Sequence, residues 1–303
     1  HARSSGRAPR PSQAVSVNDR RTWPANGRVA HPSLAGQTDI PLAAEVVRCR
    51  VCVPVADLRA TPAGARDTQL RYGEIFEALE FHDGWVFGQG AQDGYVGYLD
   101  AAACAPQTRG EGAPTHRVTL ARAHLYDAPD IKARETLALP RGALLRLSDP
   151  RAGFWRNGAG GWIAAQQVSP LASHAEDWVS AAEAYLGVPY LWGGSTPFGI
   201  DCSGLVQAAF HEAGLPCPRD SDQQRAAFPE AQGAPARGDL VFWAGHVGIM
   251  TSAETLLHAN AHHMRVACEP FAEACARIGA REFGAIVKRA RPALLQGVRE
   301  RPG

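Results

Sequence analysis

The sequence lacks the features of several protein classes. Its 303 residues hold 31 Lys and Arg against 30 Asp and Glu, a formal net charge of +1. Such a balance leaves no excess of positive charge for nucleic acid, which we do not expect as a partner. No apolar run approaches the roughly 18 residues that span a bilayer, and the N-terminus lacks the apolar core of a signal peptide. We expect a cytoplasmic protein with no membrane span. An exported chain with its signal peptide already removed is the alternative.

The seven cysteines do not suggest a disulfide framework. An odd number spread over the whole chain fits a reducing compartment better. Cys49 and Cys52 form a lone C-x-x-C pair without a second pair at zinc-ribbon spacing. His258, His262 and His263 lie close in sequence, but the H-E-x-x-H motif of zinc peptidases is absent. We therefore expect no metal and no cofactor. Four cysteines are expected to be packing residues: Cys104, Cys217, Cys268 and Cys275.

One cysteine, Cys202, lies in a pattern that favours chemistry. A glycine-rich loop from Gly193 to Gly199 precedes it, and apolar residues then recur at helical spacing until Gly214. Cys202 is thus expected in the first turn of a helix. Unpaired N–H groups and the helix dipole favour a thiolate there and can lower a thiol pKa from about 8.5 to roughly 3.5–7.5. Cys202 is a candidate nucleophile.

Two histidines downstream are candidates for the base that such a nucleophile needs. Residues 239–243 and 246–250 indicate a hairpin whose second strand begins at His246, and residues 255–260 indicate a third strand that carries His258. Neighbouring antiparallel strands can bring the two rings together. Taken singly, a buried cysteine or a strand histidine more often has a structural role. The order of the three along the chain favours catalysis.

At this point the sequence resembles the NlpC/P60 family of papain-like cysteine peptidases. The resemblance implies that Cys202 is the nucleophile, that His246 is the general base and that His258 orients it, with Tyr190 as a helper. The N–H group of Cys202, at the helix start, is the natural oxyanion donor. The motifs lie between about residues 174 and 290: Tyr190-Leu-Trp-Gly-Gly194, Phe198-Gly-Ile-Asp-Cys-Ser-Gly204, Arg219-Asp-Ser-Asp-Gln-Gln224, Gly238-Asp-Leu-Val-Phe-Trp243, His246-Val-Gly-Ile249 and His258.

The preceding region, from about residue 45 to 170, repeats with a period of roughly 70 residues. Trp85 followed by Gly97-Tyr-Leu99 aligns with Trp155 followed by Gly161-Trp-Ile163. Short strands separated by turns predict two small β-barrels, which resemble bacterial SH3-like domains. The expected fold class is α+β, with a papain-like NlpC/P60 catalytic domain after two SH3-like β-barrels. The expected boundaries are 1–44 for an extended arm, 45–110 and 111–171 for the barrels, and 172–303 for the catalytic domain.

Four shorter segments also have expected structures. Residues 23–30, which contain Asn-Gly, are expected to form a turn that docks on a domain surface. Ser173 is expected to cap a helix that ends at Gly187. Residues 284–289 should form a closing strand, and residues 291–303 a polar tail.

The resemblance also implies a substrate. The family cleaves bacterial cell-wall peptides, commonly between γ-linked D-glutamate and a diamino acid. Members with SH3-like domains and an Arg-Asp-Ser-x-Gln-Gln segment look like those that act on short peptides with a free N-terminal L-alanine, in murein peptide recycling. The expected partner is therefore L-Ala-γ-D-Glu-diamino acid. Its expected binding residues are Asp220, Ser221, Trp192, Asp201 and Ser203, with Glu74 and Tyr95 from the first barrel.

Each of these binding residues has a structural alternative. Asp220 and Ser221 precede a polar helix at residues 223–227, so either can be its cap, and Ser221 as the cap would leave Asp220 free for the pocket. Glu74 can be a solvated turn residue and Tyr95 a core aromatic. Three functional alternatives also stay open. They are a general peptidoglycan hydrolase of the wall, a wall-binding module without catalysis, and a papain-like amidase or acyltransferase on a non-peptide amide.

Overall fold

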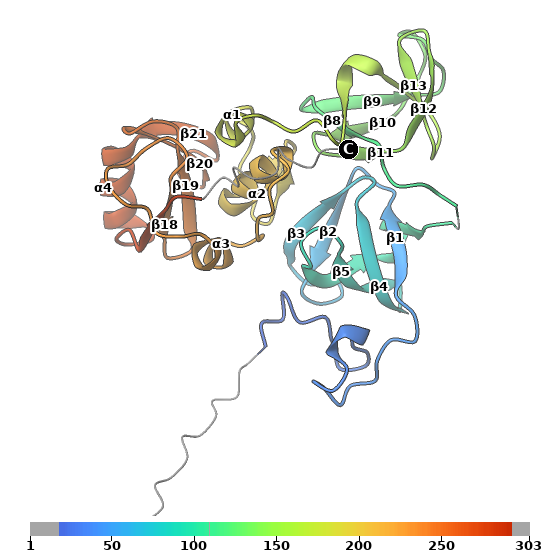
Figure 1. Cartoon of the computed structure of the whole chain (residues 1–303), viewed down its shortest axis with the longest axis horizontal. Helices are drawn as coiled ribbons and strands as arrows, with labels where there is room; N and C mark the ends of the chain where they lie inside the picture. The colour runs from blue at the N-terminus through green and yellow to red at the C-terminus, as the bar shows by residue number, and fades with distance from the viewer. Residues whose placement is uncertain (1–17, 109, 293–303) are drawn as a thin grey trace, which may run out of the picture.

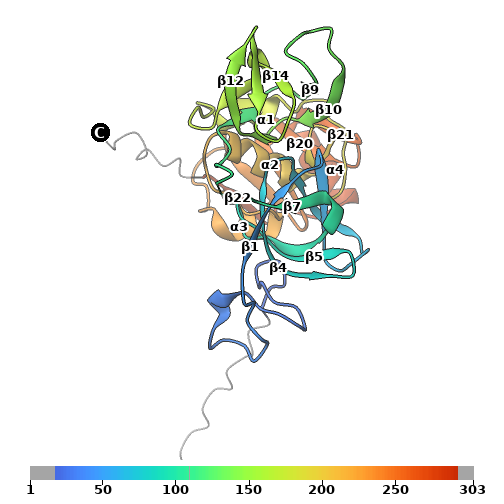
Figure 2. The same cartoon turned by 90° about the vertical axis from the view of Figure 1, so that its right-hand side faces the viewer.

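The computed structural model describes residues 18–108 and 110–292 (Figures 1 and 2). In Figure 1 the mixed helix-and-sheet unit lies beside the two β units, and the N-terminal arm lies against the first β unit. No helix in these ranges is long and apolar enough to cross a membrane. The expected arm and tail lie partly outside the described residues, at 1–17 and 293–303.

The first β unit is a strongly bent sheet with strand order β3-β2-β6-β5-β4-β1-β7. Alternate residues point inward because side chains along a strand alternate between faces. Leu58, Phe76, Val86 and Leu99 are fully buried in its core. Its strands are β1 (Val47–Val51), β2 (Val55–Arg59), β3 (Arg66–Arg71), β4 (Ile75–His82), β5 (Trp85–Gly90), β6 (Val96–Asp100) and β7 (Cys104–Pro106).

The second β unit has the same succession of strands in two smaller sheets, β10-β9-β14-β13-β12 and β11-β8-β15. Leu125, Leu139, Leu145 and Ile163 form its core. Its strands are β8 (His116–Val118), β9 (Arg122–Tyr126), β10 (Glu135–Pro140), β11 (Leu144–Leu145), β12 (Leu147–Arg151), β13 (Phe154–Asn157), β14 (Trp162–Ala164) and β15 (Val168–Pro170).

The mixed unit places helices beside a five-stranded sheet of order β21-β20-β19-β18-β22. Helix α2 contacts this sheet through β19 and β20, and Leu205, Val206 and Ala209 of the helix are buried with Val247 and Ile249 of β19. Its elements are α1 (Trp178–Glu183), β16 (Ser195–Thr196), β17 (Gly199–Ile200), α2 (Cys202–Glu212), α3 (Ser221–Ala227), β18 (Leu240–Trp243), β19 (His246–Met250), β20 (Thr255–Asn260), β21 (Arg265–Pro270), α4 (Phe271–Arg281) and β22 (Lys288–Ala290).

Most of the expected elements of the mixed unit are confirmed. The helix begins at Cys202, β18 and β19 form the hairpin, and β20 covers the six residues expected for it. Two expectations need correction. The cap of α1 is Asp177, which accepts hydrogen bonds from the N–H groups of Val179 and Ser180, in place of Ser173. The closing strand is Lys288–Ala290, which pairs with β18.

The arm from residue 18 to 46 packs on the first β unit, as expected of residues 23–30. Ala25 and Ala30 form a bridge across the Asn-Gly turn, and Asn26 donates a hydrogen bond of 3.0 Å to Glu80. Arg28 binds both carboxylate oxygens of Glu80, and Ala43 is buried in an apolar cluster on the same face. The arm thus reaches the edge of the β unit that faces the mixed unit (Figure 1).

Candidate active site

Cys202 is the first residue of α2 and is 9% exposed. The N-cap, Asp201, holds this helix start because its Oδ1 accepts the N–H of Gly204 at 2.7 Å, while its Oδ2 accepts the N–H of Gly193 at 2.9 Å. The positive φ of Gly193, 70°, lets the loop turn back toward the helix. The N–H of Cys202 is among the first four of a helix, which have no intrahelical acceptor.

A buried arginine braces this loop. Arg219 is 1% exposed, and its two Nη atoms donate to both oxygens of Asp201 at 2.9 and 2.8 Å. Its guanidinium also donates to Ser203 Oγ at 2.9 Å, to the carbonyl of Gly194 and, through Nε, to Thr68 Oγ1 of β3 at 2.6 Å. The helix start is therefore tied to the first β unit. The sequence motif contained Arg219 but gave no sign of this role.

His246 and His258 are brought together as expected. Nε2 of His246 lies 2.8 Å from Nδ1 of His258, and Nε2 of His258 lies 2.6 Å from Oε1 of Glu269 on β21. His246 stacks on Phe283 with the ring centroids 5.2 Å apart. Arg277 of α4 also donates to Oε1 of Glu269. Glu269 was not anticipated from the sequence.

This chain of hydrogen bonds fixes the tautomers of both rings. Although burial opposes its charge, hydrogen bonds from His258 and Arg277 lower the pKa of Glu269 to about 2, so the ionised carboxylate accepts a hydrogen bond from Nε2–H of His258. Nδ1 of His258 is then the acceptor for Nε2–H of His246. The lone pair of His246 is consequently on Nδ1, the form that a base requires.

Burial of Cys202 and His246 acts against the thiolate that the helix start alone predicts. Burial raises the pKa of Cys202 to about 12, and the charge of Asp201 acts in the same direction, while hydrogen bonds from the N–H groups of Val247 and Ser203 oppose it. Burial likewise lowers the pKa of His246 to about 3. Burial therefore opposes the charged form of both groups and favours a thiol and a neutral imidazole at rest.

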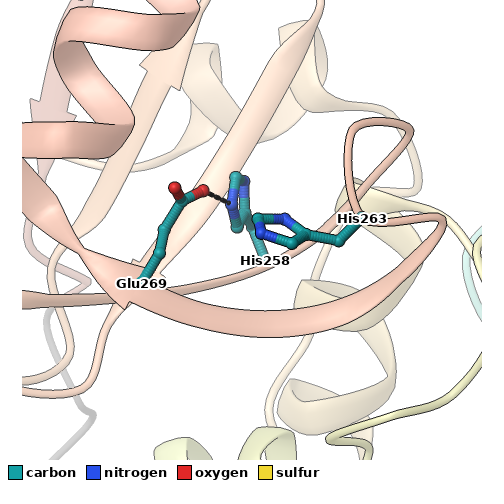
Figure 3. A group of neighbouring side chains, drawn as sticks. All are labelled: His258, His263 and Glu269. Carbon is teal, nitrogen blue, oxygen red and sulfur yellow. Dashed lines mark hydrogen bonds and ion pairs between the residues drawn. The ribbon is translucent and has the colours of Figure 1, made fainter.

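A possible metal site next to His258 is disfavoured by its own contacts. His258, His263 and Glu269 offer ligand atoms within 4.8 Å of one another, and Figure 3 shows His258 between the other two. The Glu269 oxygen that would bind a cation already accepts from His258 and from the Arg277 guanidinium. Since a fixed positive charge opposes a second cation, this group is better explained as a hydrogen-bonded support for His246.

A cavity of about 290 Å³ opens beside Cys202. Asp201 and Ser203 line it, but their side chains are also bound to Arg219. Trp192 is 70% exposed at its rim. The expected residues that line the cavity are Tyr190, Trp192, Asp201, Cys202, Ser203, Asp220, Ser221 and Tyr95.

Residues from the first β unit form one end of this cavity. Tyr95 is 4% exposed, and its hydroxyl donates to Oδ2 of Asp220 at 3.0 Å. The N-cap of α3 is Asp220, in a capping box with Gln223, so Asp220 both caps the helix and faces the cavity. Ser221 is the first helical residue, so of the two candidate caps it is Asp220 that caps the helix. Burial raises the pKa of Asp220, although Arg219, Tyr95 and Arg21 act against it.

Glu74 is the one expected binding residue placed elsewhere. It is 6% exposed and accepts from the N–H and Nε of Arg71, at a different cavity between the two β units and the end of α2. The acidic residue that the first β unit contributes beside Cys202 is Asp67 of β3.

Another correction concerns Cys268, which is exposed, whereas Cys104 and Cys217 are buried as expected.

Two regions of the chain match known protein families. Residues 187–277 match the NlpC/P60 family, and residues 58–103 match the bacterial dipeptidyl-peptidase SH3 domain. The chain carries an NlpC/P60 domain. A crystal structure of an NlpC/P60 family protein from Bacillus cereus covers 80% of this chain and 99% of its own with a TM-score of 0.68 and 19% identity, which supports the fold.

Relatives of the NlpC/P60 domain are peptidases by name. A probable endopeptidase of Corynebacterium glutamicum is 40% identical over 99 residues, which are 31% of this chain and 47% of that protein. The gamma-D-glutamyl-L-lysine dipeptidyl-peptidase of Bacillus subtilis is 36% identical over 104 residues, 30% of this chain and 34% of that protein. The matches thus span between about a third and a half of these relatives.

Proposed function

We propose that this protein is a cysteine peptidase that hydrolyses the bond between γ-D-glutamate and a diamino acid in short cell-wall peptides with a free N-terminal L-alanine. One observation carries the proposal. Tyr95 and Asp67 of the first β unit line the cavity beside Cys202 together with Asp220, whose Oδ2 accepts a hydrogen bond from the Tyr95 hydroxyl. The family match and the peptidase names of the relatives support the same reaction class.

The reaction begins with proton transfer from the Cys202 thiol to Nδ1 of His246, because Nε2 is engaged with His258. The sulfur attacks the γ-carbonyl carbon, and the N–H of Cys202 donates to the developing oxyanion. One such donor contributes roughly 2.7–4 kcal/mol of barrier lowering. The imidazolium returns its proton to the leaving amine, giving a thioester. Water then attacks the thioester with His246 again as base, and the thiol is restored.

Substrate selectivity follows from the acidic end of the cavity. An N-terminal ammonium between Asp220 and Asp67 is neutralised by their charge, with the Tyr95 ring beside it. A glycan-linked stem has an amide at this position, with no charge and added bulk. Release of an L-Ala-γ-D-Glu dipeptide would follow, in keeping with the dipeptidyl-peptidase name of the Bacillus subtilis relative. Peptides of this kind arise after the stem has left the glycan, so we propose a role in recycling.

The second β unit is proposed to be another SH3-like barrel. Its strands pair in the order β10-β9-β14-β13-β12, which corresponds one for one to β3-β2-β6-β5-β4 of the first unit. Each unit also has a short 3-10 turn, at Ala101–Ala103 or Ala165–Gln167, before its last strand. The difference is that the long β4 is replaced by β11 and β12, which belong to separate sheets.

The deciding experiment compares L-Ala-γ-D-Glu-diaminopimelate with its N-acetyl form. We expect the free amine to be preferred by roughly tenfold or more in kcat/KM, since each 1.4 kcal/mol lost by stranding a buried carboxylate is tenfold. Cys202→Ala must abolish both rates. Equal rates for the two peptides would indicate a general wall hydrolase. Turnover of simple amides but not of the peptide would indicate an amidase.

A further inference from the structure

Two arginines of the N-terminal arm, Arg20 and Arg21, line the acidic side of the cavity, and Arg21 contacts the carboxylate that is proposed to bind the substrate. Nη1 of Arg21 donates to Oδ2 of Asp220 at 2.9 Å and to Oδ1 of Asp222 at 2.8 Å, and Nη2 donates to Oδ2 of Asp222 at 2.7 Å. Arg21 itself lines the cavity. A guanidinium therefore stands where an ammonium would bind.

The hydrogen bonds of Arg21 distinguish a competitor from a substrate-binding residue. Its Nε donates to Asp19 at 2.9 Å, and its Nη2 donates to both Asp19 and Asp222. Every nitrogen of the guanidinium is thus bound to a carboxylate of the protein, so none is left to recruit a carboxylate of the peptide. Oδ2 of Asp220 likewise already accepts hydrogen bonds from the Tyr95 hydroxyl and from Arg21.

The neighbouring arginine covers the other acidic residue of the cavity. Nη2 of Arg20 lies 2.8 Å from Oδ2 of Asp67. The two adjacent arginines consequently cover both carboxylates to which the substrate ammonium was assigned. A charged amine can reach them only when residues 18–22 move away.

The rest of the arm keeps these arginines close to the cavity. The carbonyl of Arg21 accepts from the N–H of Val96 at 2.9 Å, and the Arg28–Glu80 pair and buried Ala43 hold the following residues on the first β unit. A segment tethered in this way returns at a high effective concentration after each opening.

From these contacts we infer that residues 18–22 are an internal competitor for the ammonium end of the cavity, with Arg21 as the group that mimics the substrate amine. The identity of that substrate rests on the proposed function. The contact between Arg21 and Asp220 is independent of it. The arm lowers the fraction of molecules open to peptide and leaves the catalytic group unchanged.

The test is kinetic and uses the full chain. In Arg21→Ala we expect KM for L-Ala-γ-D-Glu-diaminopimelate to fall, by about tenfold if the arm leaves about a tenth of the molecules open, because apparent affinity scales with that fraction. The value of kcat should not change. Arg21→Lys keeps the charge but loses the forked set of N–H donors, so its KM should lie between those of wild type and Arg21→Ala. A KM that rises or stays unchanged in Arg21→Ala overturns the inference.

A matched control removes a distant arginine. Arg134 is largely exposed, on the turn before β10, and faces only Asp127. Arg134→Ala changes the net charge as Arg21→Ala does and should leave KM and kcat at the wild-type values. A fall in KM in both variants would point to overall charge and would contradict the role of the arm.

A second readout does not depend on peptide hydrolysis. Cys202 reacts either with the cationic aminoethyl methanethiosulfonate or with the neutral methyl methanethiosulfonate. Mass spectrometry of the peptide that contains Cys202 measures the rate of each modification. Arg21→Ala should raise the rate of the cationic reagent severalfold more than that of the neutral one, since freed carboxylates attract it. The inference is overturned if the ratio of the cationic to the neutral modification rate is the same in wild type and in Arg21→Ala. If the peptide is not cleaved at all, the proposed function fails, and this ratio still decides about the arm.

Discussion

The hydroxyl of Tyr95 in the first β unit lies 3.0 Å from a carboxylate oxygen of Asp220, 125 residues further along the chain. This contact joins the SH3-like unit to the NlpC/P60 domain at the cavity that contains Cys202. Under the proposed function, specificity and chemistry are therefore contributed by different parts of the chain.

The first prediction concerns this contact. Tyr95→Phe removes the hydroxyl and leaves the ring, so Asp220 loses one hydrogen bond and is held less firmly. We expect KM for the free-amine tripeptide to rise by about tenfold, the equivalent of one hydrogen bond to a charged group, with kcat nearly unchanged. Tyr126→Phe on β9 of the second β unit is the matched control, because Tyr126 packs against Phe154 and does not line the cavity. An effect on kcat alone would argue against a binding role.

A second prediction concerns Glu269. Glu269→Ala frees His258, so either tautomer of the ring becomes available and His246 loses its fixed orientation. We expect kcat to fall by roughly ten- to hundredfold, as for other residues that orient a functional histidine. Glu269→Gln can still accept from Nε2–H of His258 and should lose less. Glu273→Ala, in the first turn of α4, is the control with no expected change. Equal losses in the Ala and Gln variants would mean that the charge, and not the orientation, is what matters.

The pH dependence provides a third prediction. Because burial lowers the pKa of His246 to about 3, its base form is present at all pH values above that, and the acid limb of kcat should lie well below 6.5, the ordinary histidine value. The raised pKa of Asp220 adds loss of binding on the acid side, since its charge is present only above that pKa. On the alkaline side, kcat/KM should fall near pH 8, where the substrate amine loses its proton.

The neutral state of the pair can be checked by absorbance. With a Cys202 pKa near 12, wild type and Cys202→Ala should have the same thiolate absorbance near 240 nm at pH 7. In addition, kcat should stay level above pH 8. A thiolate signal lost in Cys202→Ala, or a kcat that falls as an imidazolium deprotonates, would establish an ion pair at rest.

A fourth prediction concerns stability. Arg219→Met leaves the Asp201 carboxylate buried without its partner, which should cost about 3–5 kcal/mol of unfolding free energy. The double variant with Asp201→Asn should recover part of this loss, because the two residues form one pair. Arg237→Met removes the surface pairs with Asp177 and Glu183 and should cost no more than about 1 kcal/mol. Chemical denaturation measures the unfolding free energy of each of these variants. A loss in Arg219→Met as small as in Arg237→Met would contradict the bracing role.

The sequence predicts those parts of the site that depend on local pattern. Glycine before an apolar helical repeat indicated the start of α2 at Cys202, and alternating apolar runs indicated β19 and β20 with their histidines. Antiparallel pairing of neighbouring strands was then enough to bring His246 and His258 together. The effect of burial on the pKa of Cys202 could not be predicted from the local pattern, because it depends on packing by the whole domain.

Residues whose role depends on distant pairing were not predictable in this way. In the pairing of β20 with β21, Ala267 lies opposite His258 and Glu269 lies two positions further along β21. Glu269 is therefore a diagonal neighbour of His258 on the same face, which is evident only once the register is known. Asp67 lines the cavity because β3 lies against β16, where Gln69 accepts a hydrogen bond from Ser195. Local resemblance to the family points to Glu74 as the acidic residue, but Glu74 lines another cavity.

The hydrogen bond from Arg219 to Thr68 also affects how the protein unfolds. It links a side chain that is 1% exposed in the NlpC/P60 domain to β3 of the first β unit. If that unit opened alone, the guanidinium and its partner Asp201 would meet water, and the loop before Cys202 would lose its support. We therefore expect the two units to melt in one cooperative transition. A catalytic fragment without the first β unit would be thermally weaker and would lose its nucleophile geometry together with its selectivity.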